Sequence, residues 1–514
     1  MKRSRSKNLR YGSSALFITV LVLCAAVILN VICAMLAARY EWMYVNMNSN
    51  TVYSISDNMR DYVEEVIVPA TRREGAGEQT DGKIRITFCD TEKSIKADER
   101  MKNIYDSIMQ LKSKFPELIE TAHLNVWEDP TTAREYGVQS TGDIICEFGS
   151  KHETVNFADF YLTDPEDTST AVAYNGEKIL ASCLMRITQQ SAAMCYFTVN
   201  HGEAVENTAL MRVMIEAGYT VAFIDLSSND IPADCELLVT YSPDRDFTVK
   251  DGEKSEIDKL DAYLSGGGRY MVFINADTYA SGGHENLEGL LGEWGVTFAH
   301  KTSSSGVEQS YLVRDPSNSL TVDGYTVLSE NAQSGAGKDA LSRADYPNAF
   351  GNATAIRFSK DFKADGNGGY TKTANGITRT VSPLLVTHRS AQAWMGGITV
   401  ARATEEPFTL MSISSQTDKD GKTGYLVACS STDFASGDKL QSAVLGNSRT
   451  ITEVIRYMGR ENAPSDLVFK QFNGTNIESL TTKTANTWTV LLAVVPALVI
   501  AACGAVILIR RRYL

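Results

Sequence analysis

The sequence predicts an α/β protein, and one stretch carries most of that prediction. An apolar run over Ala193–Glu203 ends in a polar turn, a helix-patterned segment covers Asn207–Ala217, and a second apolar run covers Thr220–Leu226. This order of strand, turn, helix and strand is typical of a βαβ unit. Ligands of open α/β sheets bind beyond the carboxyl ends of the strands. The turn Asn200-His201-Gly202-Glu203 is therefore the candidate binding site.

The segments that follow extend this unit into a domain. A strand pattern over Cys235–Tyr241 and another over Arg269–Asn275 flank a helix pattern over Lys254–Leu264. Gly266-Gly267-Gly268 caps that helix, because glycine adopts left-handed geometry at little cost. Buried strands alternating with helices predict a parallel sheet covered on both faces. Further strands are expected over Ile398–Ala403, Thr409–Ile413 and Gly424–Ser430, a closing helix over Asn447–Met458, and an irregular β-rich insertion over about 301–380.

A smaller domain is predicted over 55–190. Its segments follow the order βαβ and then ββα, which is typical of a thioredoxin-like domain. Cys89 follows the first strand without a second cysteine nearby, so dithiol chemistry is excluded. The segments are Lys83–Cys89, Ala97–Phe115, Ala122–Trp127, Asp143–Phe148, His152–Phe157 and Ala173–Thr188.

Two uncharged apolar segments predict transmembrane helices at 11–38 and 488–509, since each has the roughly 20 residues needed to cross a bilayer. Basic residues precede the first and follow the second, which predicts a two-span protein of the cell membrane with both termini cytoplasmic and the large domain extracytoplasmic. A cleaved signal peptide is the alternative for the first segment. The remaining predicted segments are basic tails at 1–10 and 510–514, a juxtamembrane segment at 39–54, an α/β domain at 191–465 and a linker at 466–487.

The charge distribution argues against nucleic acid as a partner. The net charge is -13, and the basic clusters at the two chain ends leave the middle more acidic still. Six of the nine cysteines lie between the two apolar segments without a CxxC motif, so no zinc or redox site is predicted. They are either buried thiols or disulfides.

The candidate site admits three interpretations. Asn200, His201, Gly202 and Glu203 contact a ligand or a partner, they form a structural turn in which polar side chains satisfy the backbone, or His201 and Glu203 perform acid–base catalysis. Two polar side chains are too few to establish catalysis, so we predict no catalytic residue here.

Other motifs indicate no chemistry. The chain has no GxSxG elbow and no P-loop, and Cys429 lacks the flanking glycines of a nucleophile. Asp418-Lys419-Asp420-Gly421 lacks the glutamate that completes a calcium loop and predicts a hairpin turn instead. The remaining histidines are scattered. We therefore predict no metal, no cofactor and no enzymatic activity.

The order of these features resembles the GldG family, auxiliary components of a bacterial, gliding-motility-associated type of ABC transport system. The resemblance lies in Tyr53-Ser54-Ile55-Ser56, the strand Ile84–Phe88, the turn at 200–203 with Asn200 in place of a glycine, and Asn286–Leu291 followed by Gly295-Val296. It implies that 191–465 is a flavodoxin-like domain similar to class I glutamine amidotransferases without their catalytic residues. It also implies an ABC permease and an ATPase as partners, beside the lipid bilayer and an unknown substrate or envelope component.

The expected function is thus that of a non-enzymatic, membrane-anchored accessory subunit of an ABC-type transport system. One alternative is an envelope hydrolase or amidase that uses His201 and Glu203. Another is a structural envelope or adhesion protein, favoured by the Ser-, Gly- and Thr-rich residues 301–380.

Overall fold

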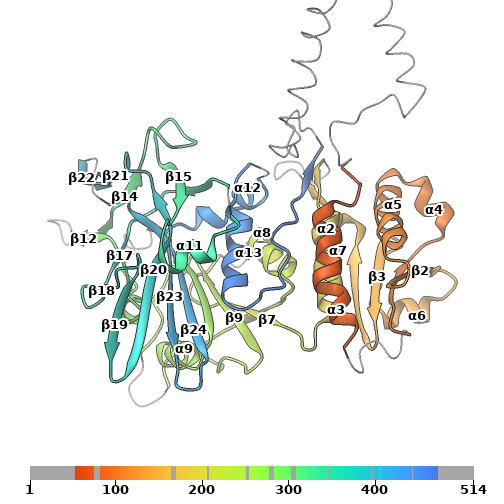
Figure 1. Cartoon of the computed structure of the whole chain (residues 1–514), viewed down its shortest axis with the longest axis horizontal. Helices are drawn as coiled ribbons and strands as arrows, with labels where there is room; N and C mark the ends of the chain where they lie inside the picture. The colour runs from red at the N-terminus through yellow and green to blue at the C-terminus, as the bar shows by residue number, and fades with distance from the viewer. Residues whose placement is uncertain are drawn as a thin grey trace, which may run out of the picture. The chain divides into compact units, whose positions relative to one another are not determined.

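Two lobes of mixed α/β structure make up the described chain: residues 52–190, joined by the C-terminal residues 466–472, form the first and residues 191–465 form the second (Figure 1). The computed structural model describes residues 52–73, 81–163, 170–204, 208–249, 254–276, 283–302, 308–344, 346–395, 398–404, 406–442 and 444–472.

The first lobe is built on a four-stranded sheet of order β2-β1-β3-β4. Strand β1 is parallel to β2 and antiparallel to β3, and β4 is antiparallel to β3. One apolar core packs α2, α5 and α7 against this sheet. The elements are α2 (Asp57–Tyr62), η2 (Val63–Ile67), α3 (Val68–Thr71), β1 (Ile84–Phe88), α4 (Glu92–Ala97), α5 (Glu99–Lys114), β2 (Ile119–His123), α6 (Pro130–Glu135), β3 (Asp143–Phe148), β4 (Lys151–Asn156), η4 (Phe157–Phe160), β5 (Tyr161–Thr163), β6 (Ala171–Tyr174) and α7 (Gly176–Thr188).

The second lobe is built on a sheet of mixed direction. Strands β8, β7, β9, β10 and β24 are parallel neighbours in that order, as the sequence predicts for this part. Beyond β24 the sheet continues through β23, β20, β15 and β16, all antiparallel to their neighbours. The prediction of a wholly parallel sheet is therefore wrong, because residues of the expected insertion at 301–380 supply strands of the main sheet.

Helices cover both faces of this sheet. One apolar core lies under α8, α11 and α13, and a second lies under α9 and α10. The elements are β7 (Met194–Thr198), α8 (Thr208–Glu216), β8 (Thr220–Ile224), β9 (Cys235–Tyr241), α9 (Glu256–Ser265), β10 (Arg269–Phe273), α10 (Glu285–Glu293), β11 (Val296–Phe298), β12 (His300–Thr302), β13 (Glu308–Ser310), β14 (Leu312–Arg314), β15 (Thr326–Asn331), α11 (Gly335–Ala340), β16 (Asn348–Gly351), β17 (Ile356–Phe358), β18 (Lys363–Ala364), β19 (Tyr370–Ala374), β20 (Ile377–Thr387), β21 (Gln392–Met395), β22 (Ile398–Arg402), β23 (Thr409–Thr417), β24 (Thr423–Cys429), η6 (Asp433–Ala435), α12 (Gly437–Leu440) and α13 (Asn447–Tyr457).

The chain returns to the first lobe after α13. Strand β25 (Lys470–Gln471) pairs with β6, and Leu467 is buried in the first lobe's core. Lys470 Nζ donates to the Ser54 carbonyl at 2.6 Å and lies 3.0 Å from Glu177 Oε1. Glu177 in turn accepts from the Ser56 hydroxyl at 2.8 Å. The two ends of the described chain are therefore fastened to the same helix, α7.

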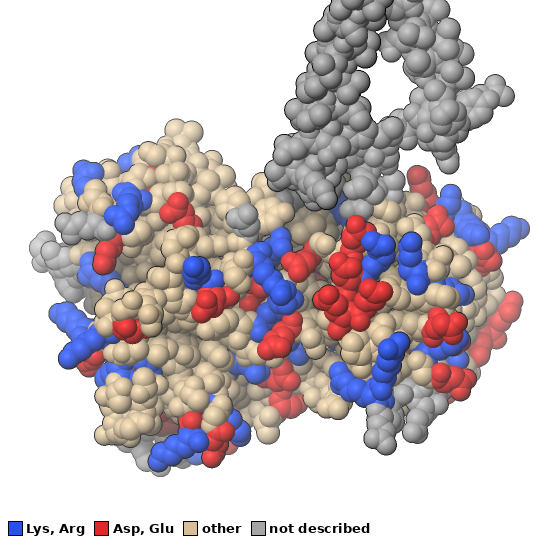
Figure 2. Space-filling view, viewed as in Figure 1, with Lys and Arg blue, Asp and Glu red and all other residues tan. Residues whose placement is uncertain are grey.

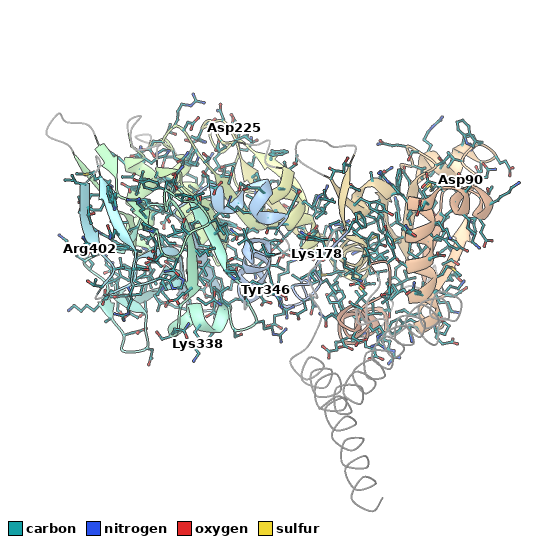
Figure 3. All side chains as sticks on the ribbon, turned by 90° about the horizontal axis from the view of Figure 1, so that it is seen from above. Asp90, Lys178, Asp225, Lys338, Tyr346 and Arg402 are labelled. Carbon is teal, nitrogen blue, oxygen red and sulfur yellow. The ribbon has the colours of Figure 1, made fainter. Side chains whose placement is uncertain are left out.

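A buried ionic cluster joins α7 to α8. Lys178 Nζ lies 3.0 Å from Glu216 Oε2, and Asn175 Nδ2 donates to Glu216 Oε1 at 2.7 Å. We call Asn175, Lys178 and Glu216 the junction cluster. Figure 3 shows Lys178 among packed side chains, and it is 8% exposed. The cluster links an element of the first lobe to an element of the second.

The predicted transmembrane helices require correction. No helix in the described ranges is both long enough and apolar enough to cross a bilayer. The 16-residue α5 falls short of the roughly 20 residues required, and it carries charged residues along one face. The segments 11–38 and 488–509 lie outside the described residues. The two-span membrane localisation with an extracytoplasmic large domain is accordingly not supported. The lipid bilayer as a partner stays a prediction.

Candidate functional site

The strand order places a switch point beside the candidate turn. In the order β8-β7-β9-β10-β24, the chain moves to one side of β7 and then to the other. Ligands of such sheets bind in the crevice at the carboxyl ends of the two strands where the order reverses. Here those strands are β7 and β9. The turn at 200–203 follows β7 and the loop at 242–249 follows β9. We call the position between these two loops, which side chains fill, the crevice.

Backbone hydrogen bonds join these two loops. The His201 carbonyl accepts from the backbone N–H groups of Asp244 and Arg245, each at 2.8 Å. Arg245 Nη2 donates to the Asn200 carbonyl at 2.8 Å. Gly202 has φ +79°, and a Cβ there would lie 2.8 Å from Asp244 Cβ. The glycine is therefore required both by its left-handed backbone and by the close approach of the second loop.

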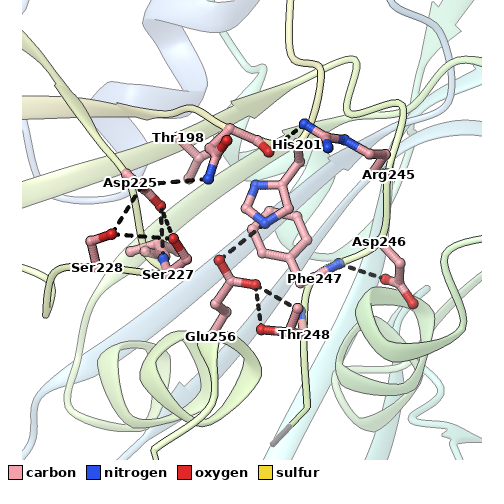
Figure 4. Close-up of polar contacts among 12 residues, drawn as sticks. Thr198, His201, Asp225, Ser227, Ser228, Arg245, Asp246, Phe247, Thr248 and Glu256 are labelled. Carbon is pink, nitrogen blue, oxygen red and sulfur yellow. Dashed lines mark hydrogen bonds and ion pairs between the residues drawn. The ribbon is translucent and has the colours of Figure 1, made fainter.

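The His201 side chain occupies the crevice (Figure 4). Nδ1 lies 3.1 Å from Glu203 Oε1, and Nε2 lies 3.1 Å from Glu256 Oε1. The ring stacks on Phe247 with centroids 4.0 Å apart. His201 is only 5% exposed. We call His201, Glu203 and Glu256 the crevice cluster.

Glu256 is the member of this cluster that the sequence analysis missed. It is the first residue of α9, whose N-cap Ser255 forms a capping box with Asp258. Its Oε2 accepts from the backbone N–H and the hydroxyl of Thr248, each at 2.7 Å. An acidic residue in the first turn of a capped helix is ordinary. Nothing in the sequence therefore distinguished Glu256 as a partner of His201.

The surroundings favour a charged imidazole. Burial alone lowers the pKa of His201, but contact with Glu203 and Glu256 outweighs burial and raises that pKa above its ordinary value. Burial raises the pKa of Glu203, but its contact with His201 and with backbone N–H groups makes the net shift downward. The pKa of Glu256 is lowered in the same way by Thr248 and His201. These shifts favour a charged imidazole between two ionised carboxylates.

The loop at 242–249 is held from its other side as well. His284 Nε2 lies 2.9 Å from the Pro243 carbonyl oxygen. Asp246 accepts from the backbone N–H groups of Asn286 and Leu287 at the start of α10. Burial lowers the pKa of His284, which favours its neutral form. The loop is therefore fixed between α10 and the turn at 200–203.

The floor of the crevice is a chain of buried hydroxyl groups. Thr198 Oγ1 and Thr240 Oγ1, at the ends of β7 and β9, lie 2.8 Å apart. Tyr270 donates to Thr240 Oγ1 at 2.9 Å. Within the described residues these groups satisfy one another. These three hydroxyl groups are therefore engaged by one another.

Asn200 is, with Gly202, an exposed member of the predicted site. It has φ +82°, and its Nδ2 donates to Asp225 Oδ2 at 3.4 Å. Asp225 also accepts from the hydroxyl groups of Ser227 and Ser228 (Figure 4). The structure thus brings Asn200, His201, Gly202 and Glu203 together with residues after β8 and β9. Their contacts are those of the structural-turn interpretation.

The other candidates have no catalytic geometry. Cys429 is fully buried, and burial raises the pKa of its thiol well above the ordinary value. Cys89 lines a small, mainly apolar pocket with Phe88 and Phe157, and burial raises its pKa to about 12. Asp418 forms the turn between β23 and β24, as predicted. Among the described residues, no group of three or more His, Cys, Asp or Glu side chains is arranged so that it could hold a metal ion.

Charged side chains of both signs lie on the surface of the described residues. Lys, Arg, Asp and Glu side chains are intermixed over the face shown in Figure 2. The exclusion of nucleic acid as a partner stays a prediction from the net charge of the sequence.

Comparison with known proteins yields only distant structural similarity. No protein-family model matches the chain, and no curated protein matches it either. The N-terminal domain of mmIFT52 is 14% identical over 52% of this chain and 96% of that one, with a TM-score of 0.36. PurLQS from Thermotoga maritima is 11% identical over 52% of this chain and 100% of that one, with a TM-score of 0.25. The cytoplasmic protein STM3548 from Salmonella typhimurium is 9% identical over 54% of this chain and 99% of that one, with a TM-score of 0.23. Similarity at this level supports no argument about function.

Proposed function

We propose that this protein is a non-enzymatic accessory subunit of an ABC-type transport system, in which the two lobes bind a substrate or a partner protein. The observation that supports the non-enzymatic part of this proposal is the filled crevice, where His201 and Phe247 occupy the position at which an α/β sheet of this order would hold a ligand. The binding role of the two lobes is proposed together with the transport system. The transport system itself is proposed from the resemblance of the sequence to the GldG family.

The geometry of the crevice cluster argues against catalysis. A general base must approach the proton that it removes to about 2.6–3.2 Å. Both ring nitrogens of His201 already lie 3.1 Å from carboxylate oxygens, and Glu256 also accepts two hydrogen bonds from Thr248. A substrate would have to displace these contacts and the stacked Phe247 ring. The cluster is therefore suited to holding two loops together.

A hydrolase that uses His201 and Glu203 is the rival function, and it makes a separate prediction. If it were correct, His201→Gln would abolish turnover of an ester or amide substrate while the circular dichroism spectrum stayed native. Under our proposal, His201→Gln destabilises the second lobe, and the wild-type protein hydrolyses none of a panel of ester and amide substrates.

Co-purification tests the transport proposal directly. The full chain, tagged and expressed at its native level, is isolated under mild conditions, and the bound proteins are identified by mass spectrometry. We expect an ATPase with a Walker A motif together with a multispan permease, at a constant ratio to the tagged chain. An unrelated tagged protein of similar net charge is the control. Recovery of neither subunit above that control would overturn the proposal.

A further inference from the structure

Six cysteines lie within the described residues, and all six are buried free thiols. Two of them are on elements that pack directly against each other. Cys146 is on β3 and Cys183 is on α7, and both are 0% exposed in the core of the first lobe. The six cysteines of the described residues are Cys89, Cys146, Cys183, Cys195, Cys235 and Cys429.

Cys146 and Cys183 are both buried in that core, on two elements that pack against each other. Ile144, Cys146 and Phe148 alternate along β3 and are buried in the same core as α7. Cys183 is flanked on α7 by Leu180 and Leu184, which are also in this core. Cys146 is near enough to Cys183 to be the leading cause of the raised pKa of the Cys183 thiol. A disulfide requires adjacent side chains from such facing elements.

We propose that Cys146 and Cys183 are a disulfide site that closes when a small-molecule disulfide such as oxidised glutathione reaches them. One cysteine thiolate attacks the added disulfide, which forms a mixed disulfide and releases one glutathione thiolate. The second cysteine then attacks the mixed disulfide, forms the Cys146–Cys183 bond and releases the second glutathione. The two thiol protons pass to the two glutathione thiolates, so two cysteines are oxidised and one disulfide is reduced.

Burial sets the condition under which the reaction occurs. Contact with Cys146 and burial raise the pKa of the Cys183 thiol, so little thiolate forms in the closed core. Exchange therefore requires partial opening of α7 from β3, by mild denaturant or during folding. Once formed, the bond is as protected from reductants as the thiols were from oxidants.

The cross-link would act on a helix that connects the two lobes. Asn175 and Lys178 of α7 bind Glu216 of the second lobe, and Glu177 binds Ser56 and Lys470. Tying α7 to β3 restricts the unfolded chain between residues 146 and 183. We therefore expect oxidation to stabilise the first lobe against unfolding.

Cys195 and Cys235 provide an internal control. They lie on the neighbouring parallel strands β7 and β9, where Cys195 is beside Leu237 and Cys235 is beside Met194. Cys195 belongs to the core on one face of the sheet and Cys235 to the core on the other. Their thiols point to opposite faces. They should therefore remain unpaired under the same treatment.

The test is thiol mapping of the full wild-type chain after treatment with oxidised glutathione in urea below the unfolding transition. Free thiols are alkylated, and the chain is digested without reduction. We expect a linked peptide containing Cys146 and Cys183, with a mass about 2 Da below the sum of the two thiol peptides. Alkylation of both cysteines, or a glutathione adduct that stays on either of them, would overturn the proposal.

Unfolding measurements provide the second readout. Oxidation should raise the urea midpoint of the wild type and of Cys195→Ala. It should leave the midpoint of Cys183→Ala unchanged, because that variant cannot close the bond. An equal rise in Cys183→Ala would contradict the assignment, and the wild-type mapping decides the question even where this variant folds poorly.

Discussion

The crevice cluster and the junction cluster both pair buried carboxylates with a positively charged group, but in different numbers. Both bury carboxylates, and both connect segments that are distant in the sequence. The junction cluster places one carboxylate, Glu216, between an ammonium and an amide. The crevice cluster places one imidazole, His201, between two carboxylates.

Because of this difference, we expect the stability contributions of the two clusters to depend differently on pH. The junction cluster contains no histidine, and its pairing joins α7 to α8. The crevice cluster has its full set of contacts only when His201 carries a proton on each ring nitrogen. A buried carboxylate pair without an intervening cation is strongly unfavourable. The contacts of His201 with Glu203 and Glu256 should therefore weaken when the imidazole loses its proton. The contact between Lys178 and Glu216 involves no histidine and should not change with that titration.

The largest expected effect comes from breaking the junction. Glu216→Ala leaves the buried Lys178 ammonium without its partner, which typically costs about 3–5 kcal/mol of unfolding free energy. Urea denaturation of the full chain measures this loss. The pair Lys178→Met and Glu216→Leu is the matched control, because removing both charges together should recover most of the stability. A loss below about 1 kcal/mol for Glu216→Ala would mean that the cluster is solvated.

The second expected effect comes from emptying the crevice. His201→Ala leaves Glu203 and Glu256 facing each other and exposes Phe247 to a void, for an expected loss of about 2–4 kcal/mol. The exposed His152 is the control, since His152→Ala should change stability by less than about 1 kcal/mol. Equal, small effects at both positions would show that the crevice is open in solution.

The pH dependence of the two variants separates the clusters. The raised folded-state pKa of His201 means that its contribution is complete below about pH 6.5, the ordinary histidine value, and is lost as the pH rises through the folded-state pKa. The lowered pKa values of Glu203 and Glu256 give a contribution that is present above about pH 4.3 and is lost as the pH falls through their folded-state values.

The measurement is the difference in unfolding free energy between the wild type and His201→Gln across this range. We expect the difference to be greatest from weakly acidic to neutral pH and to shrink in alkaline solution. The difference between the wild type and Glu216→Ala should stay level over the same interval. A His201→Gln difference that grows with pH would contradict the charged imidazole.

The smallest expected effect distinguishes contact from backbone strain at the turn. Gly202 and Gly421 have nearly equal φ values of +79° and +81°, but only Gly202 has Asp244 within reach of a new Cβ. Gly421→Ala should cost about 1 kcal/mol through backbone strain alone. Gly202→Ala should cost roughly 1 kcal/mol more, because the loop at 242–249 must move. Thermal unfolding of both variants checks the difference, and equal losses would mean that the loop yields freely.

Local pattern predicted the parts of this fold that local forces determine. The strand, helix and strand at 193–226 agree with β7, α8 and β8 to within a few residues, and Gly267 ends α9 with φ +93°. The spacing of apolar residues and the position of glycines are sufficient to predict these elements.

The antiparallel half of the sheet depends on pairing between strands that are distant in the sequence. The spacing of apolar residues within one strand does not indicate which strand it pairs with. Strand β20 also contains Pro383, which argues against a central strand, yet the structure accommodates it at a register shift opposite β23. Likewise, the turn at 200–203 was found from its position, whereas Glu256 and Phe247 were not. They reach His201 only through the tertiary fold, so the sequence left the ligand, structural and catalytic interpretations open.

The most direct test of the central claim is the charge of His201 itself. Nitrogen-15 chemical shifts of the imidazole groups in the full chain, labelled at its six histidines and assigned with His201→Gln, report this charge across a pH titration. We predict that both nitrogens of His201 are protonated at about neutral pH and that the pKa of the ring lies above the ordinary histidine pKa of about 6.5. A neutral His201 ring at that pH, with one nitrogen free to accept a proton, would contradict it.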